Sequence, residues 1–510
     1  MTDRYLILPI IGHMFTAVLL IFFWRKVNTQ RIISVLGSLA VMGLSVGLFI
    51  KTYRAGYLTM QAGNWQAPFG ITFVADVFSS TMILLTGFTG LAVCVYSTVG
   101  ISRQRIQYGF FPIFHFLLLG LNGAFLAGDI FNLYVWFEVI IISSFVLMTL
   151  GGRKPQVEGG IKYVTLNLLA SVMFLTAIAI LYGLTGSLNM ADLSLKMSAI
   201  PNKGLVEITG LLFFIGFGIK SAVFPLYFWL PSSYHTPPSA IAAIFGGLLT
   251  KVGIYALIRV YTLIFVPDPF TKQVFLVIAS LTLLTGAFGA LTKRNMRMMF
   301  SYLIVCHIGF LLGGIGMYTR LALAGTVFYL VHDIIVKTNL FLVSGLIYKI
   351  RGTMNMDELG GMYEDYPRLS LLFSVVFFSL VGIPPLSGFW PKIYLFRETF
   401  TTGAWYLLAA MIIASLVTLY VMAKMWGDVF WKKGQGMENK LTDDFSGMNW
   451  KKRGMLITPV VFLAVLSLYI GFFAQRINVL SERIANDLLH PEPYIQAVLG
   501  ADAVKTPQSE

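Results

Sequence analysis

The chain has 510 residues, of which 57% are hydrophobic and only 12% charged, whereas soluble globular proteins carry about 25% charged residues. This composition excludes a soluble enzyme, a secreted disulfide scaffold and a disordered protein, and it indicates a chain surrounded mostly by lipid. The net charge of +14 does not indicate nucleic acid, because the basic residues lie in short loops between apolar runs, as in the cytoplasmic loops of membrane proteins.

Apolar runs of the length that a bilayer requires, about 20 residues per helix, recur along the whole chain. They predict an all-α integral membrane protein with about 14 transmembrane helices, since a transmembrane barrel would alternate polar and apolar residues. The expected spans lie near residues 5–23, 32–50, 76–98, 108–126, 130–150, 161–183, 207–229, 239–262, 273–291, 300–318, 321–348, 370–398, 405–427 and 455–474.

The distribution of lysine and arginine predicts the orientation of these spans. Basic clusters follow the odd-numbered spans, such as Arg25 and Lys26 after the first span and the stretch from Lys432 to Arg453 after the thirteenth. The positive-inside rule then places both termini outside the cytoplasm in a multi-pass protein of the cell membrane. One predicted cytoplasmic loop, residues 231–238, has no lysine or arginine. Its His235 either admits protons or caps the following helix.

Two of the predicted spans contain glycine and proline breaks, and each has a lysine close to its break. The seventh span reads GFGIKSAVFPLYFWLP around Lys220, and the twelfth reads SLVGIPPLSGFWPK around Lys392. Proline removes a backbone donor, and interrupted spans in corresponding positions indicate inverted repeats with an ion site. We therefore expect two inverted five-helix repeats, spans 4–8 and 9–13. The alternative is two unrelated proline kinks.

The expected organisation has four parts. Residues 1–107 form the first three spans, residues 108–262 the first repeat, and residues 273–427 the second repeat. Residues 428–510 contain a polar cytoplasmic loop, the fourteenth span and an extracytoplasmic tail. No long linker separates these parts, so we expect one membrane-embedded unit.

Seven ionisable residues lie within or beside the apolar runs, where each costs about 2.5–3.5 kcal/mol on insertion scales. Unpaired, they would together cost about 20 kcal/mol, which exceeds the stability of a typical protein. We therefore expect them to be paired or hydrated and to serve a function. These residues are Glu138, Lys220, Lys251, His332, Asp333, Lys337 and Lys392.

Some candidates also have simpler explanations. Asp333 and Lys337 are four residues apart on one predicted helix, so they can pair with each other locally. Lys392 follows a proline and can extend its ammonium to the membrane surface. His307, in YLIVCHIGF, can be a packing residue. For Glu138, Lys220 and Lys251, which lie near the middle of their spans, these explanations are weaker.

Buried lysine, glutamate and histidine side chains suit proton transfer. Burial disfavours the charged forms of lysine and glutamate, whereas a carboxylate beside an ammonium restores both charges. Making and breaking such a pair therefore switches proton affinity. The sequence has no HExxH, CxxC, Walker or GxSxG motif, and we expect neither a metal ion nor a cofactor.

Longer motifs around these residues resemble the antiporter-like proton-translocating family. That family includes the large membrane subunits of respiratory complex I, related hydrogenases and the Mrp-type Na+/H+ antiporters. The resemblance runs from about the third to the fourteenth span, and within the family the chain is most similar to the D-type subunits of Mrp antiporters. The motifs are FPLYFWLPSSYHTPPSA, SYLIVCHIGF, HDIIVKTNLF and GIPPLSGFWPK.

The resemblance implies a fold of 14 helices with two inverted repeats and a proton pathway that crosses it. It implies a glutamate–lysine pair, a central lysine, a histidine and lysine on the eleventh helix, and a terminal lysine or glutamate on the twelfth. The pathway residues are Glu138, Lys220, Lys251, His332, Lys337 and Lys392, and the auxiliary candidates are His235, His307 and Asp333. An acid at Asp333 departs from the family's pattern.

The resemblance also implies a function and partners. The chain would be one component of a multisubunit Na+/H+ antiporter, together with a large A-type subunit and small membrane subunits. The proton gradient would supply the energy, so no ATP or redox cofactor is needed. One alternative is a redox-driven proton-pumping subunit of a complex I or hydrogenase type enzyme, whose core motifs would be the same. A second alternative is a structural subunit that passes no ion.

Overall fold

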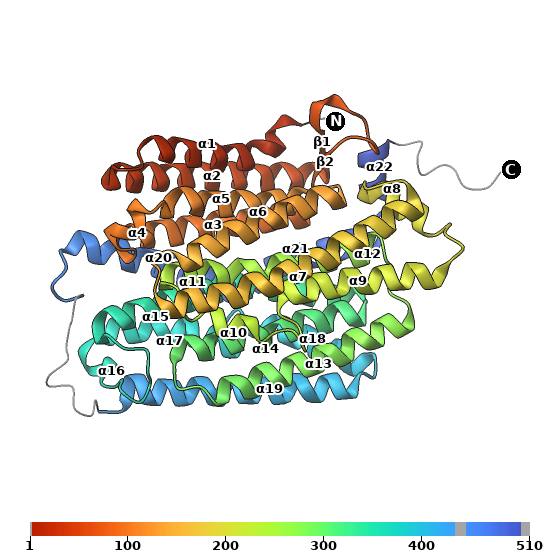
Figure 1. The fold of residues 1–510 in the computed structure, drawn as a ribbon. Coiled ribbons are helices and arrows are strands. Elements are labelled where there is room, and N and C mark those ends of the chain that lie inside the picture. Colours follow the sequence, from red (N-terminus) through yellow and green to blue (C-terminus); the bar gives the residue numbers. More distant parts are fainter. Residues whose placement is uncertain (1–2, 434–444, 501–510) are drawn as a thin grey trace.

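A computed structural model describes residues 3–433 and 445–500, and it confirms the predicted all-α membrane architecture (Figure 1). Twelve helical segments of these residues are long and apolar enough to cross a membrane, and the two shorter apolar helices Phe110–Leu126 and Pro367–Val381 occupy two further predicted spans. The twelve are Arg4–Phe22, Val27–Ala55, Val77–Gly100, Ile130–Thr149, Lys154–Thr185, Lys203–Ser221, Ser239–Leu263, Pro269–Leu291, Met296–Met317, Arg320–Arg351, Trp405–Trp431 and Trp450–Phe472.

The first hundred residues form helices on one side of the bundle and a short antiparallel sheet, in which Leu58 pairs with Ala75. The Asp76 side chain accepts a hydrogen bond from Ser79 N at 2.7 Å, which satisfies a backbone donor at the start of the third long helix. The elements are η1 (Arg4–Ile7), α1 (Leu8–Phe22), α2 (Val27–Ala55), β1 (Leu58–Gln61), η2 (Ala62–Asn64), β2 (Thr72–Ala75), α3 (Val77–Gly100) and α4 (Arg103–Gln107).

The next part contains the first predicted break. The helix that carries Lys220 ends at Ser221, Ala222 has a left-handed backbone with φ of 59°, and helical structure resumes only at Trp229. The elements are α5 (Phe110–Leu126), α6 (Ile130–Thr149), α7 (Lys154–Thr185), α8 (Met190–Met197), α9 (Lys203–Ser221), α10 (Trp229–Ser233), α11 (Ser239–Ile244), the π-helical turn η3 (Phe245–Leu249) and α12 (Thr250–Leu263).

The second predicted break is also present. One helix ends at Val381 and the next begins at Phe389, so residues 382–388 interrupt the twelfth span. The elements are α13 (Pro269–Leu291), α14 (Met296–Met317), α15 (Arg320–Arg351), α16 (Met362–Asp365), α17 (Pro367–Val381), α18 (Phe389–Thr401), α19 (Trp405–Trp426) and the π-helical turn η4 (Gly427–Trp431).

The C-terminal part is more helical than the predicted tail. After α20 (Trp450–Phe472) the chain continues as α21 (Ala474–Leu489) and α22 (Glu492–Leu499). Ala485 of α21 packs against Leu323 and Ala324 of α15, so this segment is part of the bundle. Residues 434–444 of the predicted polar loop and residues 501–510 of the predicted tail lie outside the described residues.

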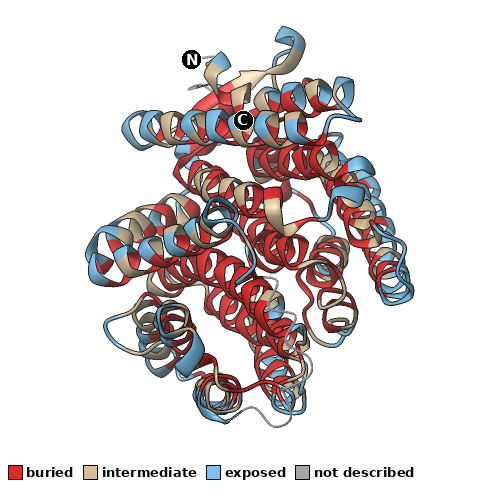
Figure 2. Cartoon of the chain, turned by 90° about the vertical axis from the view of Figure 1, so that its left-hand side faces the viewer, coloured by how far each residue is buried: buried red, intermediate tan, exposed pale blue. Residues whose placement is uncertain are grey.

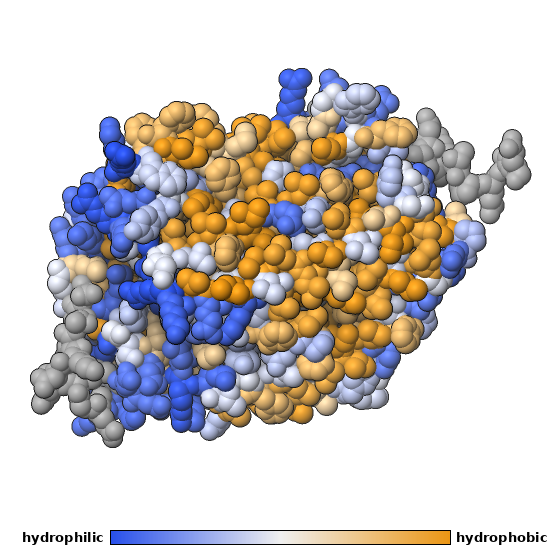
Figure 3. Space-filling model, in the orientation of Figure 1, coloured by the Kyte–Doolittle hydropathy of each residue, from blue (hydrophilic) through white to orange (hydrophobic). Residues whose placement is uncertain are grey.

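Burial divides the bundle into central and outer helices (Figure 2). The apolar 18-residue stretch is 100% buried in α15 and in the continuous helix Ser239–Leu263. In α2 only 28% of the corresponding stretch is buried. The face shown in Figure 3 has a broad apolar area, with most of its hydrophilic residues at one end. Polar side chains on the central helices are therefore shielded from lipid and must find partners within the protein.

Candidate functional site

The centre of the site is a buried carboxylate that two basic side chains contact. Asp333 Oδ2 on α15 lies 2.8 Å from Lys251 Nζ on α12. Asp333 Oδ1 accepts a hydrogen bond from His307 Nδ1 on α14 at 2.9 Å. All three side chains are fully buried. Because both carboxylate oxygens have basic partners, side chains from two other helices compensate the buried charge of Asp333.

A widened helical turn positions Lys251. Its Nζ donates to the carbonyl oxygen of Gly246 at 2.7 Å, within the π-helical turn η3 that immediately precedes α12. Such turns are often found at functional sites. A Cβ on Gly246 would lie 2.7 Å from Phe341 Cε2, and a Cβ on Gly247 would collide with Thr338 Oγ1. The two glycines thus let this helix approach α15 closely.

Lys337 does not form the local pair that its spacing from Asp333 permits. The Asp333 carboxylate contacts Lys251 and His307 instead. Lys337 is fully buried, and its Nζ forms no hydrogen bond to any described residue. One buried carboxylate therefore has a paired lysine on the neighbouring helix and an unpaired lysine one turn along its own helix.

His332 lies beside the second helix break and begins a row of hydroxyl groups. Its Nδ1 is 2.8 Å from Ser387 Oγ, which is 2.9 Å from Ser467 Oγ, and Ser467 donates to Ser379 Oγ at 3.0 Å. All four side chains are buried. A row of hydroxyl groups can accept and donate protons in sequence, and this row joins α15 to α20 through the break.

Lys392 is held inside the bundle by the same break. Its Nζ donates to the carbonyl oxygen of Val381 at 2.7 Å and lies 5.5 Å from the centre of the Phe310 ring. Only 4% of the residue's surface is exposed, so the lysine does not extend to the membrane surface. The interruption after Val381 leaves that carbonyl without a helical partner and available to the ammonium.

The expected pair of Glu138 and Lys220 is not in direct contact. Lys220 Nζ donates to Ser171 Oγ at 3.3 Å and lies 4.8 Å from the centre of the Phe137 ring. Glu138 has a buried Oε1 that no described residue hydrogen-bonds. The ion pairs among the described residues include none between these two side chains, although they are near enough to interact electrostatically.

The first break packs directly against the helix that carries Lys251. A Cβ on Gly253 of α12 would collide with Ser221 Oγ and would lie 3.1 Å from the carbonyl oxygen of Phe217. The hydroxyls of Ser221 and Thr250 are both buried and form no hydrogen bond within residues 3–433 and 445–500. Buried polar groups without a protein partner usually bind ordered water, so this contact can connect Lys220 with Lys251.

His235 lies apart from these residues, in the loop between α10 and α11. Its Nδ1 is 2.7 Å from the carbonyl oxygen of Pro231. Burial lowers the pKa of His235, and the charges of Arg297 and Lys162 act in the same direction. The ring is therefore mainly neutral at pH 7, when it can accept a proton.

A buried pair of histidines was not predicted from the sequence. His13 Nδ1 and His115 Nδ1 lie 3.0 Å apart, and His115 Nε2 is 2.9 Å from Ser34 Oγ. Both rings are buried between α1, α2 and α5. Each histidine lies inside an apolar run, IIGHMFTA and PIFHFLLL. His307 was identified from the same pattern, so the sequence could have indicated these two histidines as well.

A buried ion pair between α12 and the residue that precedes α3 was also not predicted from the sequence. Arg259 Nη2 of α12 lies 2.6 Å from Asp76 Oδ2, and both side chains are buried. Arg259 lies within an apolar span, so its burial was recognisable, but its partner is 183 residues away in the chain. Two turns of α12 separate this pair from Lys251.

Comparison with known proteins shows relatives over the whole chain. Residues 127–418 match the family described as NADH:quinone oxidoreductase/Mrp antiporter, TM. The D subunit of the Na+/H+ antiporter of Alkalihalophilus pseudofirmus is 41% identical over 498 residues, which cover 98% of this chain and 99% of that protein. The protein of the same name from Bacillus subtilis is 38% identical, with coverage of 98% and 99%.

A solved structure shares the fold. A chain of the Mrp complex from Dietzia sp. superimposes with a TM-score of 0.87 at 28% sequence identity, covering 98% of this chain and 100% of that chain. The whole bundle, including the region of both helix breaks, therefore has a counterpart in a known membrane assembly.

Proposed function

This chain belongs to the NADH:quinone oxidoreductase/Mrp antiporter family of membrane proteins, and we propose that it is the proton-translocating D-type subunit of a multisubunit Na+/H+ antiporter. It is a multi-pass protein of the cell membrane and acts as a secondary transporter with other membrane subunits, including a large A-type subunit. The redox-driven alternative has less support, because the relatives at 38–41% identity are named antiporter subunits over nearly their full length.

The buried cluster of Lys251, Asp333 and His307 carries this proposal. A charged group at membrane depth is costly, and here an ion pair with both side chains fully buried lies at the centre of an apolar bundle. Packing alone does not require charge there, since a buried ion pair is often no more stabilising than apolar residues of similar size. Proton transfer does require groups that can change their charge.

We place the pathway along the residues identified from the sequence. Protons pass from Glu138 to Lys220, cross the contact between Ser221 and Gly253 of α12 to Lys251, and reach Lys392 through the α15 residues His332 and Lys337. Water bridges the steps at which the described polar atoms have no protein partner. The second break supplies the carbonyl oxygen of Val381 to which the buried Lys392 donates.

The Asp333 carboxylate acts as the switch of this pathway. It pairs with Lys251 in the structure, and Lys337 lies one helical turn away without a partner. Pairing favours the charged form of a buried lysine, and loss of the pair favours release of its proton. Movement of the carboxylate from one lysine to the other therefore transfers proton affinity along the membrane plane, and the His307 hydrogen bond restrains that movement.

The orientation and the internal repeats belong to the same proposal. Both termini lie outside the cytoplasm, and the four parts end at residues 107, 262, 427 and 510. The two breaks, each beside a buried lysine, support inverted repeats of residues 108–262 and 273–427. Accessibility labelling of single cysteines introduced near residue 5 and near residue 154 tests the orientation, because only the first should react from outside intact cells.

Substitution of Lys251 tests the function itself. Lys251→Ala should abolish Na+-dependent proton flux in membrane vesicles that contain the complete complex, and Lys251→Arg should not restore it, because a guanidinium does not release its proton. Lys196→Ala, which removes an exposed lysine paired with Asp192, is the matched control and should leave flux unchanged. Full activity of Lys251→Arg would show that position 251 supplies only fixed positive charge.

A further inference from the structure

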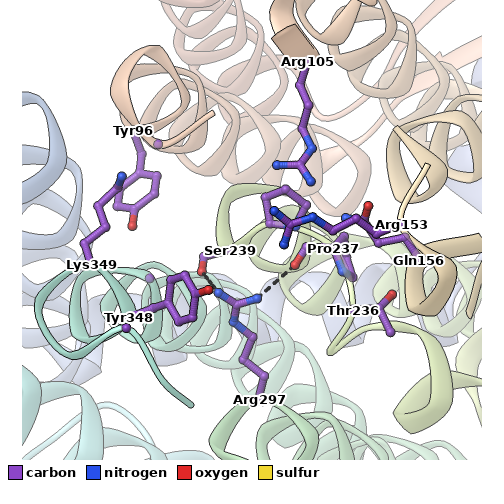
Figure 4. Close-up of a pocket in the computed structure, with 14 residues that line it drawn as sticks. Tyr96, Arg105, Arg153, Gln156, Thr236, Pro237, Ser239, Arg297, Tyr348 and Lys349 are labelled. Carbon is purple, nitrogen blue, oxygen red and sulfur yellow. Dashed lines mark hydrogen bonds between the residues drawn. The ribbon is translucent and has the colours of Figure 1, made fainter. Parts of the chain in front are cut away.

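A recess with a volume of about 460 Å³ opens at the end of the bundle that carries the basic loops. Its walls come from the ends of α3 and α15, the starts of α7, α11 and α14, and the short helix α4 (Figure 4). Four basic side chains line it, Arg105, Arg153, Arg297 and Lys349, and we call it the basic recess. Its volume is in the range of small-ligand sites, about 300–1,000 Å³.

Among the residues that the structure describes, none that lines the basic recess is acidic. None of the three arginines forms an ion pair with a carboxylate in residues 3–433 and 445–500, although ten such pairs exist elsewhere in those residues. Like charges that converge in a shared cavity repel one another, and the field they produce attracts an anion. The electrostatic complement of this recess is therefore negative.

Hydrogen bonds to the protein fix the direction of two of the guanidinium groups. Arg297 donates from Nη1 to the carbonyl oxygen of Pro237 at 3.0 Å and from Nη2 to Ser239 Oγ at 2.5 Å. Arg105 donates from Nε to the carbonyl oxygen of Leu150 at 2.9 Å. Arg297 and Arg105 are half-buried, and Figure 4 shows the Arg105, Arg153 and Arg297 side chains extending toward the same space.

The positive-inside rule alone does not explain this arrangement. It requires basic residues at this end of the bundle, and exposed residues such as Arg103 and Lys154 satisfy it without lining the recess. It does not require guanidinium groups from separate helices to be held around one cavity. Arginine presents planar pairs of donors that match the oxygens of a phosphate group, and basic pockets between transmembrane helices on the cytoplasmic side bind anionic headgroups.

We propose that the basic recess is a binding site for a phosphate-bearing anion, supplied either by the headgroup of an anionic phospholipid or by soluble phosphate. The anion neutralises the converging arginines and ties together α4, which precedes the predicted repeats, α7 of the first repeat and α14 of the second. Ser239, which also lines the recess and accepts from Arg297, can add a neutral hydroxyl donor. This site is separate from the proton pathway and stands whether or not that pathway is correct.

Binding of two defined probes to the full-length chain tests the site. The chain is purified in neutral detergent, stripped of lipid and examined by native mass spectrometry with phosphatidylglycerol, with zwitterionic phosphatidylcholine as the reference lipid. Inorganic phosphate is titrated separately by calorimetry. We expect one tightly retained anion per chain. Retention of phosphatidylglycerol identifies the headgroup as the source, whereas binding of inorganic phosphate without preference for the anionic lipid identifies the soluble anion.

Matched pairs of variants locate the binding. Arg153→Gln should weaken it about tenfold, the effect of losing one hydrogen bond to a charged group, and Lys154→Gln removes the same charge from the neighbouring exposed position. Arg105→Gln and Arg103→Gln form a second pair on α4. Thermal unfolding of each variant shows whether it is folded, and Arg153 is the safer position because the residue is exposed. Equal binding by recess and control variants, or no binding of either anion, overturns the proposal.

Discussion

Lys251 and Asp333 lie 2.8 Å apart and are both completely buried, although 82 positions separate them in the sequence and each belongs to a different helix. Asp333 has a nearer lysine in the sequence, Lys337, but makes its contacts with Lys251 and His307. The central helices thus hold one carboxylate among three basic groups. This arrangement can exist in more than one pairing, which is what a proton switch requires.

Removing the charge of Asp333 should stop transport and lower stability together. Asp333→Asn keeps a hydrogen-bond acceptor for His307 but leaves Lys251 buried without a counter-charge, which costs about 3–5 kcal/mol. We expect loss of Na+-dependent proton flux in vesicles and a lower midpoint of thermal unfolding for the purified complex.

The double variant Lys251→Met with Asp333→Asn separates the two effects. It removes both charges, so most of the lost stability should return while flux stays absent. A double variant that transports protons normally would contradict a role of this pair in the pathway. One that stays as unstable as Asp333→Asn would show that the pair is needed for folding.

Glu138→Gln should abolish coupled transport without preventing assembly. The carboxylate is half-buried near Lys220 but makes no direct ion pair, so its loss removes a proton acceptor and a charge partner without breaking a contact that holds the fold. Flux and the amount of complex in the membrane are measured together. Glu158→Gln is the control, since Glu158 is exposed and forms an ion pair with Lys162 one helical turn away. Normal flux in Glu138→Gln would place the start of the pathway elsewhere.

Lys392→Ala should block net transport, and Lys392→Glu should retain part of it, because glutamate can also carry a proton across the second break. The alanine variant also leaves the Val381 carbonyl without its present donor. Ion-coupled proton flux is compared with that of Lys424→Ala, an exposed lysine on α19. Full flux in Lys392→Ala would make Lys392 a structural residue and would place the proton outlet elsewhere.

Gly388→Ala should disturb the second break directly. A Cβ at this position would collide with the carbonyl oxygen of Ser379 and would lie 3.0 Å from two ring atoms of His332. We expect reduced flux and a lower thermal midpoint, because the backbone must move away from the ring and from the row of hydroxyl groups. Gly388 has an ordinary negative φ of −77°, so the matched control is Gly183→Ala on α7, where a Cβ would meet nothing within 4 Å. Gly388→Ala with the activity and stability of Gly183→Ala would refute the tight packing at the break.

The sequence alone determined which parts of this protein cross the membrane and which residue types matter there. Lipid admits only long apolar helices and makes each buried charge costly, so the spans, the two breaks and the residues Lys220, Lys251 and Lys392 stood out before any contact was known. The family could also be recognised at this level, because its motifs surround those same residues.

Only the tertiary structure decided which of these groups meet. Spacing along α15 allowed a pair of Asp333 with Lys337, but the π-helical turn at Phe245–Leu249 and its two glycines bring Lys251 to the carboxylate from another helix. The serine row beside His332 and the basic recess likewise join residues that are distant in the chain. Local sequence fixes the face of a helix on which a side chain lies, whereas the partner it finds depends on helix packing, which long-range contacts determine.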